Sequence, residues 1–198
     1  MSRRGEVTLT AEPTDAELAR AVCNGDEDAF ATLFQRHRRR VAIVAGRFFR
    51  RTEEVEDVVQ ESFVKAYFAL REFSDDGSGS MAGWLSKIAF NTCYDELRRR
   101  RRKPETSSAE LTDEEMQTVR SLVTTEEISV ESASISRDLA NKLLSRLSPE
   151  DRIVLVLLDV EGLTTSEIGQ TLGWSSAKVK IRAFRARNDL RRILRKFL

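Results

Sequence analysis

The chain has 198 residues, of which 33% are charged and 40% hydrophobic, with only 9 glycines and 3 prolines. This composition favours a soluble, all-α protein over a β-sandwich or barrel, and the length allows one sizeable core or two small ones. The net charge of +1 conceals segregation, because residues 98–103 are all basic, the stretch after them is acidic, and the C-terminus is basic again.

We expect four helices in a first unit over residues 14–103, each with an apolar stripe at three- and four-residue spacing. Thr14 opens the first helix with a capping-box pattern, and Pro104 ends the fourth. Residues 1–13 show no periodicity and are expected to form a loose tail. The helices are predicted over residues 14–24, 26–51, 52–73 and 81–103, with a Gly/Ser-rich loop at 74–80.

The third of these helices has a face that mixes acceptors with apolar groups. Asp57, Gln60, Glu61 and Val64 lie there, and Phe68 continues the face by one turn. Such a mixture is typical of a protein-docking surface. The alternative is that Val64 and Phe68 merely widen the core.

The fourth helix has a face suited to a nucleic-acid strand. Cations attract phosphate, an amide can read a base edge, and aromatic rings stack on unpaired bases. The alternative is a solvated basic face above an ordinary core stripe. The residues that share this face are Trp84, Lys87, Asn91, Asp95, Arg98 and Arg102.

An acidic, Ser/Thr-rich stretch over residues 104–132 is predicted to be a flexible linker to a second unit, residues 133–198. In that unit Ser148 caps a helix whose run Ile153–Leu158 is apolar nearly all round, so we expect it to form the buried centre. Gly162 is expected to end this helix.

The chain ends in the pattern of a helix-turn-helix. Thr164 caps a short helix to Leu172, a turn follows at 173–175, and the last helix is predicted from 176 to about 197. Gly169 lets the two helices approach closely. The alternative is a basic amphipathic hairpin. The cations expected near the major groove are Lys178, Lys180, Arg182, Arg185 and Arg187.

The sequence offers no candidate for catalysis or metal binding. Cys23 and Cys93 are too few for a disulfide framework or a four-cysteine zinc site, and we expect both to be buried thiols. His37, the only histidine, lies in an apolar stripe and is interpreted as a core-edge residue. We therefore predict no enzyme, no cofactor and no metal. Without an export signal or a membrane-spanning run, a cytoplasmic protein is expected.

Together the two units resemble a bacterial RNA polymerase sigma factor of the extracytoplasmic-function (ECF) type. Residues 57–67 (DVVQESFVKAY) resemble the family's polymerase-docking region, and residues 84–91 (WLSKIAFN) resemble the segment that opens and reads the −10 element. Residues 167–169, 179–180 and 184–187 resemble the −35-reading helix-turn-helix. The match runs from about residue 14 to the end of the chain, in the family's order and spacing.

The resemblance implies an all-α fold in which a region 2 helical bundle and a region 4 helix-turn-helix domain are joined by the linker. It implies docking of Asp57, Gln60, Glu61 and Val64 on the β′ clamp helices, contact of the second unit with the β flap, and control by an anti-sigma factor. It assigns the −10 element to Phe73, Trp84, Lys87, Asn91, Arg98, Arg99 and Arg102, with Phe73 and Asn91 holding a flipped base, and phosphate contacts to residues 98–103. It assigns the −35 element to Ser176, Lys178, Lys180, Arg182, Phe184 and Arg185.

Several features depart from the family's pattern. The Gly/Ser-rich loop between Phe73 and Trp84 is longer than expected, and Met81 stands where an aromatic residue is frequent. In the second unit, residues 158–159 (LD) stand where a basic residue is frequent, residues 177–178 (AK) replace a frequent Gly-Thr, and Ile181 puts an apolar group on a normally polar face. Two other functions compete with a sigma factor. A stand-alone helix-turn-helix regulator explains the second unit but leaves the faces of the first unit without a purpose. A nucleic-acid enzyme lacks candidate groups.

Overall fold

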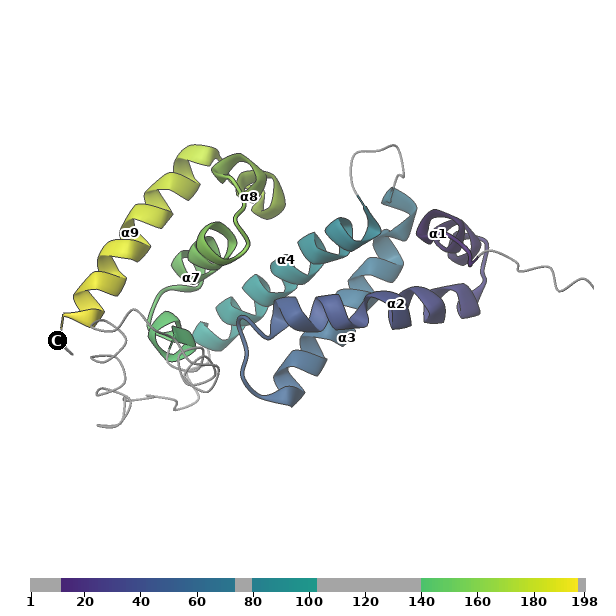
Figure 1. The fold of residues 1–198 in the computed structure, drawn as a ribbon, viewed down its shortest axis with the longest axis horizontal. Coiled ribbons are helices and arrows are strands. Elements are labelled where there is room, and N and C mark those ends of the chain that lie inside the picture. The colour runs from purple at the N-terminus through teal and green to yellow at the C-terminus, as the bar shows by residue number, and fades with distance from the viewer. Residues whose placement is uncertain (1–11, 74–79, 103–139, 196–198) are drawn as a thin grey trace, which may run out of the picture.

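The computed structural model describes residues 12–73, 80–102 and 140–195, and every regular element in these ranges is a helix (Figure 1). The all-α prediction is therefore confirmed for this part of the chain. The first unit contains α1 (Asp15–Cys23), α2 (Glu27–Ala45), α3 (Thr52–Ala69), a short 3₁₀ turn (Leu70–Glu72) and α4 (Met81–Arg102). Helices α2, α3 and α4 pack on one another, and α1 packs on α2.

The end of α2 differs from the prediction. The helix was expected to reach about residue 51, but it ends at Ala45, with Gly46 as its C-cap. Beyond this cap, Phe48 and Phe49 both lie in the core, where they are 2% and 4% exposed.

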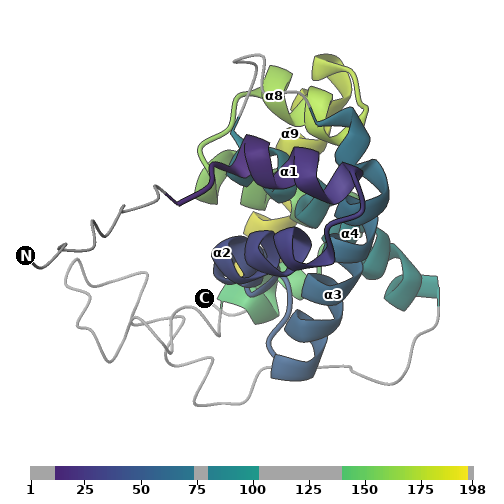
Figure 2. The same ribbon diagram turned by 90° about the vertical axis from the view of Figure 1, so that its right-hand side faces the viewer.

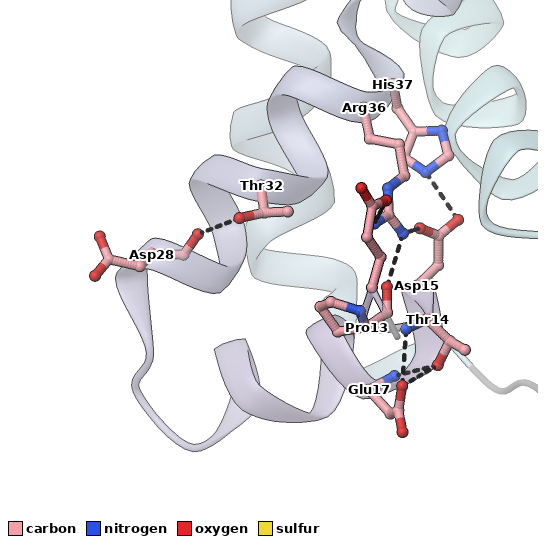
Figure 3. A network of polar contacts seen from close by, with 9 residues as sticks. Pro13, Thr14, Asp15, Glu17, Asp28, Thr32, Arg36 and His37 are labelled. Atoms are coloured by element: carbon pink, nitrogen blue, oxygen red, sulfur yellow. Dashed lines mark hydrogen bonds and ion pairs between the residues drawn. The ribbon is translucent and has the colours of Figure 1, made fainter. Parts of the chain in front are cut away.

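The single histidine, His37, takes part in a polar network between α1 and α2 (Figure 3). His37 is buried, and its Nε2 lies 2.9 Å from Oδ2 of Asp15. Arg36 donates to the other oxygen of Asp15 and to the carbonyl of Pro13. The interpretation of His37 as a core-edge residue is confirmed, and its contacts fasten α1 to α2.

The two cysteines have different environments. Cys93 is fully buried in α4, and burial raises the pKa of its thiol. Cys23 is exposed at the end of α1, so the expectation that both thiols are buried was wrong for Cys23. Cys23 is the last residue of α1 and does not belong to the buried face of this helix, which includes Leu18 and Val22.

The second unit contains a helical stretch over residues 140–145, then α7 (Pro149–Leu155), a π-turn (Val156–Val160), α8 (Thr165–Leu172) and α9 (Ser176–Leu194). Ser148 caps α7 as predicted, accepting a hydrogen bond from the backbone of Asp151. The prediction of a buried centre is confirmed, because residues 153–157 are all at most 4% exposed. Ile135, Leu139 and Phe197, placed on inward stripes by their spacing, lie outside the described residues.

The two units pack against each other and share one hydrophobic core (Figure 1 and Figure 2). Helices α7 and α8 of the second unit lie beside α4 of the first. The shared cluster includes Phe48, Phe90 and Cys93 from one unit and Ile153 and Ile168 from the other. Helix α9 packs on α7 and α8 and lies on the side of the second unit away from α2 and α3 (Figure 1).

A buried cation lies in the contact between the units. Arg152 of α7 is only 6% exposed, and its Nη2 donates to the carbonyl oxygen of Phe48 at 2.6 Å. Its Nε is buried without a hydrogen-bond partner among the described residues. Burial lowers the pKa of the Arg152 guanidinium to about 10. Removing this charge from water costs free energy, and that cost lowers the stability of the contact between the two units.

Candidate nucleic-acid interface

Helix α4 presents the face predicted for a nucleic-acid strand. Lys87 is exposed, while Trp84 and Asn91 are half-buried on the same side of the helix. The ring of Phe73, at the end of the 3₁₀ turn, lies 5.5 Å from the ring of Trp84. The structure thus brings together an aromatic pair, a cation and an amide, which are groups able to hold and read an unpaired base.

The amide of this face is already engaged. Nδ2 of Asn91 donates to the carbonyl oxygen of Thr171, the penultimate residue of α8, at 3.0 Å. One turn further along α4, the ring of Tyr94 packs edge-on against Trp174 at 5.6 Å. The second unit therefore covers the centre of the face that the sequence assigns to the −10 element.

The cations at the basic end of α4 are all exposed but differ in their contacts. Arg99 pairs with Glu96 within α4. Arg100 pairs with Glu54 and Glu96, and its guanidinium lies 4.8 Å from the ring of Phe49, so it joins α4 to α3. Partial burial acts to raise the pKa of Glu54, but the hydrogen bond and charge of Arg100 outweigh it and the pKa is lowered. The predicted phosphate contacts Arg98, Arg99 and Arg102 are exposed, and Lys103 lies outside the described residues.

A basic cleft of about 780 Å³ lies where α2, α4 and α8 meet. Arg39, Arg40 and Lys87 line it from the first unit, and Glu161 and Glu167 line it from the second. Arg47 and Glu161 form an ion pair across it, with Nε and Oε1 2.8 Å apart but not aligned as a hydrogen bond. The cleft continues the cationic surface of α4 onto α2, a contribution that the sequence prediction missed.

The helix-turn-helix forms as predicted. Thr164 and Glu167 make a capping box at the start of α8, and Ser175 caps α9 by accepting from the backbone of Lys178. Gly169 is essential to the close approach, because a Cβ there would lie 2.6 Å from the carbonyl oxygen of Trp174. This distance is too short for any side chain, so the turn depends on glycine at this position.

Helix α9 exposes most of the residues assigned to the −35 element. Ser176, Lys178, Lys180, Phe184 and Arg185 are all exposed. Arg182 differs, because it is half-buried and its Nη1 lies 3.4 Å from Oδ1 of Asp151 in α7. In this arrangement Arg182 joins α9 to α7.

The predicted docking face is the exposed side of α3, and the inward stripe of the same helix is buried. Asp57, Gln60, Glu61 and Val64 are all exposed, and Lys65, next to Val64, pairs with Glu61 and with Asp95 of α4. Val64 is 56% exposed and Phe68 is 79% exposed. The alternative that Val64 and Phe68 widen the core is therefore wrong.

Comparison with known proteins matches both units to families. The Sigma-70 region 2 family matches residues 33–103, and the Sigma-70 region 4 family matches residues 137–190. The ECF RNA polymerase sigma factor SigM of Mycobacterium tuberculosis (strain ATCC 25618 / H37Rv) is 32% identical over 184 residues, covering 92% of this chain and 86% of its own. SigW of Bacillus subtilis (strain 168), also an ECF sigma factor, is 32% identical over 178 residues, covering 88% and 93%.

A solved structure is similar as well. CnrH, in complex with the cytosolic domain of CnrY, superimposes with a TM-score of 0.55 at 27% identity, covering 92% of this chain and 97% of that one. An all-helical pair of units with a helix-turn-helix and both matched regions defines the sigma-70 class of initiation factors. The chain belongs to the ECF RNA polymerase sigma factors within that class.

This membership settles the function at the level of the family. The protein is a sigma factor that binds core RNA polymerase and directs transcription initiation at promoters with −10 and −35 elements, and not a stand-alone regulator. Sigma factors are not enzymes, and no group of histidine, cysteine and acidic side chains able to hold a metal is found among the described residues. None of the described helices is long and apolar enough to cross a membrane.

Proposed function

We propose that the sigma factor divides its task among three surfaces, carried by a region 2 domain (14–103) and a region 4 domain (133–198) on a tether (104–132). The first surface is the face of α3 around Gln60, which docks on the β′ clamp helices of the polymerase. Its support is the exposure of Val64 and Phe68, which are 56% and 79% exposed among hydrogen-bond acceptors, since exposed apolar groups with a polar rim mark protein-interaction sites.

The docking face is tested by placing positive charge on it. Gln60→Lys together with Glu61→Lys should weaken co-purification with core polymerase while the circular dichroism spectrum remains that of a folded helical protein. A control is Glu27→Lys on the exposed first turn of α2, which changes the charge by two units where the double variant changes it by three. If the double variant retains the polymerase as well as the control does, the face is not the docking surface.

The second surface is the face of α4, which holds a −10 base flipped out of the non-template strand. Unstacking a base costs a few kcal/mol, and stacking on an aromatic ring returns about 1–3 kcal/mol. Phe73 and Trp84 supply the rings, Asn91 the hydrogen bonds, and Lys87, Arg98, Arg99 and Arg102 the attraction for phosphate. The observation that carries this proposal is the clustering of these groups on one side of α4.

Replacement of Asn91 by Ala tests the base-reading role. A base-specific hydrogen bond contributes about 1–3 kcal/mol, so promoter opening in a permanganate footprint should fall by about tenfold. Binding of the variant to core polymerase serves as the internal control and should not change. Normal opening at a cognate promoter would contradict the assignment.

The third surface is α9, which reads the −35 duplex while its domain contacts the β flap. Its exposed cations Lys178, Lys180 and Arg185 suit phosphates, and Ser176 and Phe184 lie in the same N-terminal half of the helix. Each phosphate contact removed should lower the dependence of log binding on log salt by about 1. Lys180→Gln in the holoenzyme should therefore reduce both affinity and salt slope; an unchanged slope would count against a phosphate contact.

We also propose that the protein works in the cytoplasm with RNA polymerase and is held inactive by an anti-sigma factor. The similarity to CnrH, solved with a domain of CnrY, supports a protein partner of this kind. Such a partner should block co-purification with core polymerase. A purified candidate that binds the sigma factor without lowering polymerase binding would contradict its assignment as an anti-sigma factor.

A further inference from the structure

The exposed face of α9 is apolar along its centre. Ile181 and Phe184 are 53% and 67% exposed, and Ala177, one turn before Ile181, is also exposed. Steps of four and three residues place all three in one stripe. The buried face of the same helix, formed by Val179, Ala183 and Ala186, lies on the opposite side. The stripe therefore points away from the domain that carries it.

Cations border this stripe on both sides. With about 100° of rotation per residue, Lys178 and Arg185 lie along one edge, and Lys180 and Arg187 lie along the other. Two of these charges are held in place by neighbours. The Nζ of Lys178 lies 3.8 Å from the ring centre of Trp174, and Arg187 pairs with Asp159 at 2.7 Å.

An apolar centre between two rows of cations fits the major groove of duplex DNA. Phosphates form the two walls of the groove, and base edges form its floor. The floor offers one apolar group, the C5-methyl of thymine. We propose that Ile181 and Phe184 recognise thymines in the −35 element by burying these methyl groups, so that part of the −35 specificity is carried by apolar contact.

This inference depends on the proposed function of α9 as the −35-reading helix, and it names the chemistry that the helix reads. A protein partner for the stripe is a poorer fit, because it would need an apolar ridge with an acidic row on each side. Duplex DNA supplies both rows of negative charge through its two backbones. The apolar side chain at position 181 then becomes a determinant of base preference.

The test removes single methyl groups from the DNA. Promoters selected by the reconstituted holoenzyme from a randomised −35 region are remade with deoxyuridine in place of each thymidine, on either strand. Loss of one buried methyl group should weaken holoenzyme binding by about fourfold at the contacted positions. In Ile181→Ala, the fourfold difference between thymine and uracil should disappear at one of these positions. Val160→Ala, which trims an aliphatic residue of the same domain that is 56% exposed, should retain it.

Each other outcome overturns the inference. Selected −35 elements without thymine on either strand, or equal binding of thymine and uracil by the unmodified protein, would show that methyl groups are not read. Equal weakening of both DNAs by Ile181→Ala would show that the stripe contacts something other than a methyl group, such as the polymerase. If selection instead yields no −35 preference at all, the proposed function of α9 fails first, and the inference fails with it.

Discussion

The ion pair between Arg47 and Glu161 gives direct control over the contact between the two units. Nε of Arg47 and Oε1 of Glu161 lie 2.8 Å apart, and the two side chains are 31% and 21% exposed, so the pair is neither fully solvated nor fully buried. Two charges about 4 Å apart attract by about 4 kcal/mol at an effective dielectric constant of about 20, and desolvation and side-chain ordering leave about 1 kcal/mol. Glu161→Arg replaces this attraction with repulsion of similar size.

We call the protein closed when the two units are packed together and open when they are apart. The expected change is about 2 kcal/mol, or about 30-fold in the ratio of closed to open protein. Because the closed arrangement engages the amide of Asn91, opening should increase the affinity of the free protein for a single-stranded −10 oligonucleotide, by at most the same factor. Fluorescence anisotropy with a labelled oligonucleotide measures this affinity. Extra positive charge alone also attracts DNA, so Glu53→Arg, with the same charge change on the first turn of α3, is the matched control.

The swapped variant Arg47→Glu with Glu161→Arg restores the pair with opposite polarity and the original net charge. It should bind the oligonucleotide as weakly as the unmodified protein does. Two results would refute the reasoning: equal affinities for Glu161→Arg and Glu53→Arg, or a swapped variant that keeps the tight binding of Glu161→Arg. Either would mean that the contact across the cleft does not limit access to α4.

Three further predictions concern stability and reactivity. Gly169→Ala forces a Cβ against a backbone oxygen and should destabilise the protein by about 1–3 kcal/mol in thermal unfolding. At Gly83, in the first turn of α4, a Cβ would make only an ordinary contact with the hydroxyl of Ser80, so Gly83→Ala should stabilise the protein by up to about 1 kcal/mol. A thiol reagent should modify Cys23 and spare Cys93 until the protein is unfolded, as mass spectrometry of the labelled peptides can show. The lowered pKa of Glu54 means that its contribution to stability is present above pH 4.5 and lost as pH falls through the lowered value, so Glu54→Gln should flatten acid unfolding there; an unchanged acid limb would contradict this.

The helices of both units could be predicted from sequence because their signals are local. The capping box at Thr14, the cap at Ser148 and the sequence around Gly169 each determine structure within a few residues. The end of α2 could not be predicted, because Phe48 falls on the apolar stripe of a longer helix and is also buried by the non-helical turn that the chain makes. Local spacing does not distinguish these alternatives.

The contact between the units had no counterpart in the sequence pattern. Arg152 stands next to an apolar run, and nothing nearby in sequence indicates that its guanidinium donates to a carbonyl 104 residues away. Asn91 lies on the face of α4 that the spacing predicted, but its hydrogen bond to Thr171 depends on the docking of a helix 80 residues away. Such long-range contacts follow from the tertiary arrangement, which periodicity does not encode.

The burial of Arg152 also bears on how temperature affects the closed arrangement. The hydration free energy of a charged group becomes less favourable on warming, so enclosing a guanidinium is less costly in a hot solution than in a cold one. This contribution strengthens the contact as temperature rises and weakens it on cooling. Through this side chain, a cold shock would favour separation of the units, and heat by itself would not.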